Sequence, residues 1–262
     1  MPHPQLIVEH SPDGFRWLRL ARPERRNALD VALALAVRDA LREEPEVPVL
    51  LGSTDPRVFC AGADLTISDA ERAVITDLIY DCCEIMVTRP GAVIAVVTGP
   101  AVGGGAQLAA ASDLRIAGPD ARLRWIGPPG LDLAVGAWLL PDLAGRGAAM
   151  ELVLTGRWVE AAEALALGLV NRIEDDPEQA AEQLAAGLAA QGGNAAGRIQ
   201  MIQEVLGGEG VEGIRGVQGV GAGVKAVMAA GGLLDRLRAE REVNRSAWAR
   251  VTGVNPVGQR PR

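Results

Sequence analysis

The chain has 262 residues, of which 48% are hydrophobic and 23% charged, and its formal net charge is −7. This length and composition are typical of one globular domain, or of a domain with a short appendage. The acidic balance argues against a nucleic-acid partner, whose binding surface would normally be basic. No window reaches about 18 uninterrupted apolar residues, and the N-terminus lacks the features of a signal peptide. We therefore expect a cytoplasmic protein without a membrane span.

Side chains for the common nucleophilic and metal sites are scarce. The histidines are His3 and His10, both near the N-terminus, which argues against Ser-His, Cys-His and zinc-histidine sites. The cysteines are Cys60, Cys82 and Cys83, an odd number without the spacing of a disulfide framework, so we expect reduced thiols. Cys82 and Cys83 are expected to pack inside a helix. No metal and no separate cofactor is expected.

The first hundred residues alternate short apolar runs with helical patterns. QLIVEH and FRWLRLA flank the turn SPDG and predict two strands. Helices are predicted over residues 29–44, with Asp30 in the first turn, and over about 67–88. VPVLLGS and VFCAGADL predict strands, the second ending in a turn of small residues. GAVIAVVTG is a continuous apolar run, as expected of a strand covered on both faces.

The glycine triplet at 103–105 opens a predicted alanine-rich helix, and LRIAG and ARLRW predict further strands. GPPGLDLAVG is expected to be a loop leading into a helix around Trp138. GAAMELVLTG and VEAAEALALG predict helices, LVNRI predicts a strand, and the pattern from Pro177 onward is mostly helical. Alternating strands and helices favour an α/β fold. The glycine-rich segment 207–232 needs packing against another part of the chain or another subunit.

Two turns of small residues carry the candidate chemistry. The glycine triplet leaves unpaired backbone N–H groups at a helix start, where a ligand can approach closely and negative charge is favoured. The turn CAGAD, residues 60–64, could supply a second N–H, and two such donors suit an oxygen that becomes anionic. Two alternatives remain open: a dinucleotide fingerprint, weakened by Leu108 at the third glycine position, and tight helix–strand packing without a ligand.

The order of the motifs resembles the crotonase superfamily, which is the enoyl-CoA hydratase/isomerase family. RPERRNALD, FCAGADL, GPAVGGGAQLAAASD, MELVLTGR and ALALGLVN match its pattern in sequence and spacing. The resemblance implies a spiral of repeated β-β-α units over residues 1–195 and a C-terminal helical segment over 196–262 used in trimerisation. It also implies a coenzyme A thioester as substrate or ligand, and a homotrimer or a pair of trimers.

By the same resemblance, the thioester carbonyl accepts hydrogen bonds from the backbone N–H groups of Ala63 and Gly104, which form an oxyanion hole. The other positions that the resemblance assigns to the coenzyme A or acyl site are Arg25, Arg26, Ala28, Ala61, Asp64, Leu65 and Gly103. Asp64 and Asp113 are expected chiefly to anchor turns. Trp125 and Trp138 either line the acyl pocket or fill the core.

The two glutamates with which hydratases of this family deliver water are missing. The first position holds Gln107, which has no titratable proton near neutral pH. The second falls near residues 125–127 and holds no acid, and a third family position, an aspartate, aligns with Ala134. Asp132 is the candidate replacement, an exposed loop or capping aspartate being the alternative. Asp69 is expected to serve the first turn of a helix.

These observations leave three hypotheses for the function. The first is an acyl-CoA enzyme of the hydratase/isomerase type with a non-standard proton-transfer residue. The second is a catalytically silent protein of the same fold that binds or carries acyl-CoA. The third is a structural or partner-binding role. The missing glutamates argue against standard hydration, since each general acid or base contributes about 10² to 10⁴ in rate, whereas thioester binding needs only the backbone donors and an apolar channel.

Overall fold

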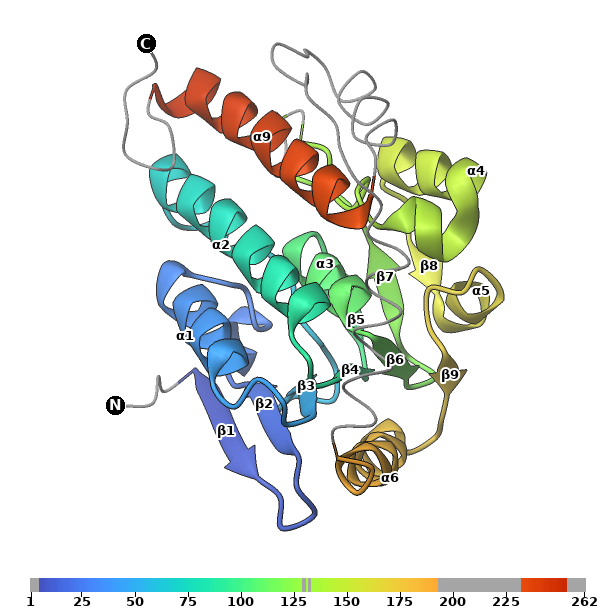
Figure 1. The fold of residues 1–262 in the computed structure, drawn as a ribbon. Helices are drawn as coiled ribbons and strands as arrows, with labels where there is room; N and C mark the ends of the chain where they lie inside the picture. Colours follow the sequence, from blue (N-terminus) through green and yellow to red (C-terminus); the bar gives the residue numbers. More distant parts are fainter. Residues whose placement is uncertain (1–4, 129–130, 132, 193–231, 254–262) are drawn as a thin grey trace.

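The computed structural model describes residues 5–128, 131, 133–192 and 232–253. These residues form an α/β fold with two sheets, which confirms the expected fold class (Figure 1). The larger sheet has six strands in the order β1-β2-β3-β4-β6-β9. Its strands are β1 (Leu6–His10), β2 (Arg16–Leu20), β3 (Val49–Ser53), β4 (Val93–Val97), β6 (Leu114–Ala117) and β9 (Arg172–Ile173). The first pair is antiparallel and the remaining pairs are parallel.

The smaller sheet has three strands in the order β5-β7-β8, namely β5 (Pro100–Val102), β7 (Arg122–Arg124) and β8 (Val159–Glu160). β5 was not expected from the sequence, because the strand pattern before the glycine triplet reads as one run. The expected strand VFCAGADL is wrong: the segment makes only the single bridges Cys60↔Ala101 and Leu29↔Ala63. The chain turns at Gly62, where φ is +85°, so a continuous ladder cannot form.

The helices follow the sequence pattern closely, except that Trp138, expected within a helix, lies in the turn before Leu140. They are α1 (Val31–Arg42), α2 (Asp69–Thr88), α3 (Gly104–Ala111), α4 (Leu140–Thr155), α5 (Ala161–Ala166), α6 (Pro177–Ala189) and α9 (Leu233–Thr252), with a 3-10 turn at Pro23–Arg25. Asp30 caps α1 by accepting a hydrogen bond from the N–H of Leu33. Ser68 and Glu71 form a reciprocal capping box at the start of α2, which fixes where that helix begins. α4 is interrupted at Gly145, where φ is +76°.

Both faces of the larger sheet are covered. α6 packs on one face against Phe15, Trp17, Leu50, Ile94 and Val96, while the alternate residues of the same strands join the main core on the face covered by α1, α2 and α3 (Figure 1). All five residues of β4 are buried, as its unbroken apolar run predicts. No helix in the described part of the chain combines the length and apolar character that crossing a bilayer requires.

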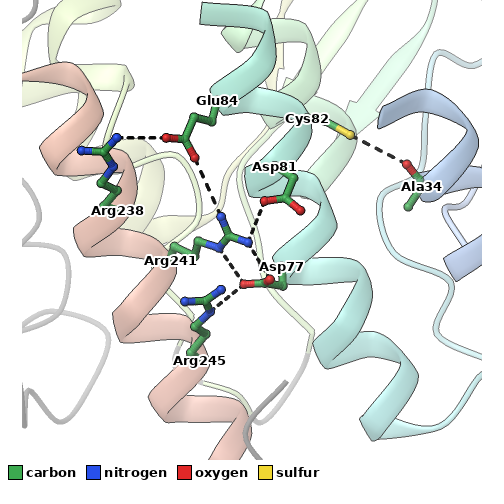
Figure 2. Close-up of polar contacts among 8 residues, drawn as sticks. All are labelled: Ala34, Asp77, Asp81, Cys82, Glu84, Arg238, Arg241 and Arg245. Carbon is green, nitrogen blue, oxygen red and sulfur yellow. Dashed lines mark hydrogen bonds and ion pairs between the residues drawn. The ribbon is translucent and has the colours of Figure 1, made fainter. Parts of the chain in front are cut away.

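The C-terminal helix α9 lies along α2 in the same chain (Figure 1). Three arginines on one face of α9 meet three acids on α2 (Figure 2). Arg241 pairs with Asp77 at 2.6 Å and with Asp81 at 2.7 Å, and Arg245 pairs with Asp77 at 2.6 Å. The predicted boundary between the two segments, at residues 195 and 196, and the glycine-rich stretch up to residue 231 lie outside the described residues.

Candidate functional site

The turn at residues 60–64 is pressed against the glycine triplet. A Cβ atom added to Gly62 would lie 2.7 Å from the carbonyl oxygen of Val102 and 3.5 Å from the backbone nitrogen of Gly104. A Cβ atom on Gly105 would lie 2.4 Å from the carbonyl oxygen of Cys60. Glycine is therefore required at both positions for the two backbones to approach so closely. Tight helix–strand packing was one of the two alternatives left open by the sequence, and the two segments do pack tightly here.

The backbone N–H of Ala63 points away from Leu29, with which Ala63 forms a β-bridge. Leu29 donates to the carbonyl of Gly62 at 2.7 Å, and Asp64 donates back to the carbonyl of Leu29 at 2.8 Å. Because successive residues of an extended chain direct their N–H groups to opposite sides, the N–H of Ala63 faces away from Leu29. No backbone hydrogen bond between described residues uses this N–H.

Gly104 is the first residue of α3, so its N–H has no acceptor within the helix. Gly103, with φ of +53°, precedes it and donates to the carbonyl of Arg124 at 2.8 Å. The first intrahelical bond runs from the N–H of Gln107 to the carbonyl of Gly103 at 3.0 Å. Among the backbone hydrogen bonds of the described residues, none uses the N–H of Gly104. The helix start thus keeps a free donor beside the 60–64 turn.

A cavity of about 230 Å³ joins the two turns. Its described lining residues are Ala61, Gly62, Ala63, Leu65, Thr76, Ile79, Val102, Gly103, Gly104, Gln107, Ile126, Gly127, Pro128, Leu133, Val135 and Asn244. The lining is mostly apolar, and none of these described residues carries a charge. Asp132, the candidate replacement acid, lies outside the described residues.

Gln107 is a buried part of this wall, with 4% of its surface exposed. Its Oε1 accepts a hydrogen bond of 3.0 Å from the indole Nε1 of Trp138. Trp125 and Trp138 are both fully buried in the core, and neither is among the lining residues. This placement fits the second of the two roles considered for them, which is to fill the core.

The loop before α4 is fastened to α9 by two residues that the sequence analysis did not identify. Glu240 accepts hydrogen bonds from the N–H of Gly136 and the N–H of Trp138, both at 2.9 Å. Asn244, one turn further along α9, accepts from the N–H of Ala134 at 3.0 Å and donates to its carbonyl at 2.9 Å. α9 therefore supplies both a wall residue of the cavity and the clamp on its loop.

Glu240 is fully buried. Burial raises the pKa of its carboxyl to about 8, although hydrogen bonds from Tyr80 and from the backbone of the clamped loop oppose the rise. The sequence carried a signal that could have identified it. Leu237, Glu240, Asn244 and Trp248 recur at helical spacing on one buried stripe of α9, and polar residues on such a stripe are rarely buried without a purpose.

Residues assigned by resemblance to the coenzyme A end lie around the same turn. Asn27, at the centre of RPERRNALD, is fully buried and donates to Ser53 at 2.6 Å and to the carbonyl of Phe59 at 3.0 Å, which ties this motif to the 60–64 turn. Ala61 and Leu65 line the cavity, and Leu65 is 57% exposed. Arg25 and Arg26 are exposed and Ala28 is buried, and none of the three lines the cavity.

The aspartates expected to anchor turns make such contacts. Asp64 pairs with Arg22 at 2.9 Å and accepts from the N–H of Thr66, outside the cavity lining. Asp113 accepts from the N–H of Val93 at 2.7 Å, and burial raises its pKa to about 6. Asp69 is the first residue of α2 and pairs with Arg72.

The cysteines are buried away from bases. Cys60, Cys82 and Cys83 are free thiols, and burial raises the pKa of Cys60 and of Cys82 to about 12. Thiols with such high pKa values are poor nucleophiles at neutral pH. The structure gives no support for cysteine chemistry at this site.

Comparison with known proteins identifies the family. The sequence model described as enoyl-CoA hydratase/isomerase matches residues 12–204. The chain therefore belongs to the enoyl-CoA hydratase/isomerase family. It is 36% identical over 170 residues to a protein of Mycobacterium leprae named as a probable enoyl-CoA hydratase, a match that covers 62% of this chain and 68% of that protein.

Two solved structures show the same likeness. An enoyl-CoA hydratase from Bacillus anthracis superposes with a TM-score of 0.68 at 26% identity, covering 91% of this chain and 89% of that one. A monofunctional enoyl-CoA isomerase from M. smegmatis has a TM-score of 0.64 at 29% identity, covering 78% and 92%. Both a hydratase and an isomerase are similar to this chain, so the likeness does not single out one reaction.

Proposed function

We propose that this chain binds acyl-CoA thioesters in the 230 Å³ cavity, with the thioester carbonyl oxygen between the N–H groups of Ala63 and Gly104. The observation that carries the proposal is that both unused N–H groups belong to residues of one apolar cavity. Two such donors stabilise the oxyanion or enolate that forms when a thioester reacts, and removing one costs about 10² to 10³ in rate where this has been measured.

The proposed reaction differs from two-acid hydration. Gln107 accepts the indole hydrogen bond of Trp138 and has no titratable proton, and no described lining residue is an acid. An enolate would form here without a carboxylate at the first position to move its protons. Our proposal is an acyl-CoA enzyme of the hydratase/isomerase family whose proton-transfer group lies elsewhere, with Asp132 as the candidate.

The second candidate is a catalytically silent acyl-CoA binding or carrier protein of the same fold. The neutral polar side chains of the cavity favour it, since binding requires the donors and the apolar walls only. A homotrimer or a pair of trimers and a cytoplasmic location complete the proposal; the assembly rests on family resemblance, and the location on the cysteine pattern that predicts reduced thiols. Light scattering after size-exclusion chromatography tests the assembly.

A pair of variants at Gly104 tests the thioester site. Gly104→Pro removes the N–H at the first helical position, where proline is well tolerated, while Gly104→Ala adds a Cβ and keeps the N–H. Both variants place a Cβ against the flexible Cδ1 of Ile79, and proline in addition puts its Cδ where the N–H was. We expect the proline variant to bind butyryl-CoA at least about fivefold more weakly than the alanine variant, because it loses one neutral hydrogen bond and its Cδ also crowds the carbonyl position. Equal affinities would contradict the proposed carbonyl position.

Mass spectrometry of thioester turnover separates the two candidates. Wild-type protein is incubated with crotonyl-CoA, 3-hydroxybutyryl-CoA and a dienoyl-CoA at high enzyme concentration. Conversion of any one of them that is lost in Asp132→Asn supports the enzyme with the displaced acid. Saturable binding in calorimetry without conversion supports the silent binder.

A further inference from the structure

The amide of Gln107 has a fixed orientation. An indole N–H can only donate a hydrogen bond, so the atom of Gln107 that meets Nε1 of Trp138 at 3.0 Å must be the oxygen. Only 4% of the surface of Gln107 is exposed, and the residue lines the cavity. The amide oxygen is therefore turned toward Trp138, which is not a lining residue. The NH₂ group is the end of the amide that is left to bind a ligand in the cavity.

The NH₂ group of Gln107 is unengaged. No hydrogen bond recorded for the described residues uses its Nε2. The other polar side chains of the described lining are already occupied. Thr76 donates to the carbonyl of Arg72 and accepts from the indole of Trp248, and Asn244 uses its amide on Tyr80 and Ala134. Gln107 is thus the polar side chain of the described lining that can still bind a ligand, and it offers donors.

Rotating the Gln107 amide is disfavoured because Trp138 is itself held in place. The backbone N–H of Trp138 donates to Oε2 of Glu240, and the N–H of Gly136 donates to Oε1. If the amide turned over, its NH₂ group would face the indole N–H, and the buried indole would lose its acceptor. Glu240 therefore acts as a positioning residue for the donor end of Gln107, although it lies 133 positions further along the chain.

The rest of the cavity restricts the kind of acceptor that Gln107 can bind. None of the described lining residues carries a positive charge, so a carboxylate on the acyl chain would be buried without a counter-ion, which is costly. A neutral oxygen with lone pairs and no proton, such as a ketone, matches two N–H donors. Gln107 follows Gly104 by three residues of α3, about 4.5 Å along the helix axis, and both line the cavity, so a thioester held at Gly104 would place its acyl chain along the same wall as Gln107.

We propose, on the basis of the thioester site above, that the Trp138-held amide of Gln107 selects 3-oxoacyl-CoA thioesters by donating a hydrogen bond to the ketone oxygen. A glutamate at this position would present an acceptor to the acyl chain. Gln107 presents a donor, which converts a position suited to holding water into one that recognises a carbonyl.

Two matched ligands test the selectivity in the full-length chain. Acetoacetyl-CoA carries the 3-oxo group, and isovaleryl-CoA has the same branched outline with a methyl group in place of the oxygen. By calorimetry we expect acetoacetyl-CoA to bind about fivefold more tightly, as one neutral hydrogen bond gives. If neither thioester binds, the thioester site itself is wrong. If both bind with equal affinity, the thioester site stands and the role of Gln107 falls.

Variants identify the residue responsible. Gln107→Met keeps the side-chain length without the donors, and we expect the ratio of the two dissociation constants to fall to about one. Gln107→Glu keeps an acceptor for the indole and presents a second oxygen, so acetoacetyl-CoA should bind more weakly than isovaleryl-CoA. Gln183→Met is the same substitution on the exposed face of α6 and should keep the wild-type ratio. A ratio that stays near five in both Gln107 variants would overturn the proposal.

Discussion

The hydroxyl of Tyr80 donates a hydrogen bond of 2.7 Å to Oε1 of Glu240, and neither side chain is exposed to solvent. Tyr80 belongs to α2 and Glu240 to α9, so this bond joins the two helices that cover the cavity. Tyr80 also accepts from Nδ2 of Asn244 at 2.7 Å. The three side chains form one buried polar cluster behind the cavity wall, and its stability depends on how its acid titrates.

Replacing the carboxyl of Glu240 should change how stability depends on pH. Burial raises its pKa from an ordinary 4.5 to about 8. Between these values the unfolded chain releases the proton while the folded chain keeps it. The free energy of unfolding should therefore fall as the pH rises from about 4.5 to 8, by at most about 1.4 kcal/mol per pH unit. Glu240→Gln has no such proton to lose.

Chemical unfolding of both proteins between pH 5 and 8 measures this effect. We expect the stability advantage of the wild type over Glu240→Gln to shrink steadily with rising pH and to level off above pH 8. A difference that stays constant over this range would show that the carboxyl does not titrate there.

Gly62 is expected to tolerate no side chain. Its φ is +85°, and a Cβ atom would lie 2.7 Å from the carbonyl oxygen of Val102. We expect Gly62→Ala to lower the free energy of unfolding by about 1 to 3 kcal/mol and to weaken acyl-CoA binding. Gly187→Ala is the control, since Gly187 lies in α6 with open space around it and should gain up to about 1 kcal/mol. Thermal melting with and without butyryl-CoA checks both variants.

Asn27 should be sensitive to substitution for two separable reasons. Its amide is bonded to Ser53 and to the carbonyl of Phe59, and its φ of +53° is in the left-handed region. Gly and Ala both remove the side-chain hydrogen bonds, but only glycine adopts this φ without strain. We therefore expect Asn27→Ala to be less stable than Asn27→Gly by about 1 kcal/mol, and both to be less stable than the wild type. Denaturant unfolding measures the order, and an alanine variant equal to the glycine variant would exclude the backbone contribution.

The ion pairs between α2 and α9 should hold the C-terminal helix in place (Figure 2). Burial alone would raise the pKa of Asp77, but hydrogen bonds from Arg241 and Arg245 bring it below the ordinary 3.8. Its contribution to stability is therefore present above that pH and decreases as the pH falls further. We expect Asp77→Asn to cost about 1 to 3 kcal/mol, because the side chain is only 18% exposed.

Hydrogen exchange along α9 measures that loss directly. Amides of α9 should exchange faster in Asp77→Asn than in the wild type. Glu84→Gln serves as the control, because Glu84 pairs with Arg238, which is 61% exposed, and meets Arg241 only at 3.9 Å, so we expect a change below about 1 kcal/mol. Exchange that accelerates equally in both variants would mean that no single pair positions the helix.

Much of the fold could be predicted because its signals are local. The apolar run of β4 has both faces covered, and Asp69 lies in the first turn of α2 as expected. Two errors were made in neighbouring segments: a strand was predicted over VFCAGADL, and β5 was not predicted. Each is a short segment whose pairing depends on a partner that no local pattern specifies.

The sequence by itself determined the alternation of strands and helices, the two turns of small residues and the lack of an acid at position 107. Each of these depends only on residues that are close together in the chain. Only the tertiary structure decided that the oxygen of Gln107 meets the indole of Trp138, and that Glu240 and Asn244 of α9 clamp the loop before α4. Those contacts join residues between 31 and 110 positions apart. Their partners are chosen by which surfaces pack together, and that information is spread over the whole core.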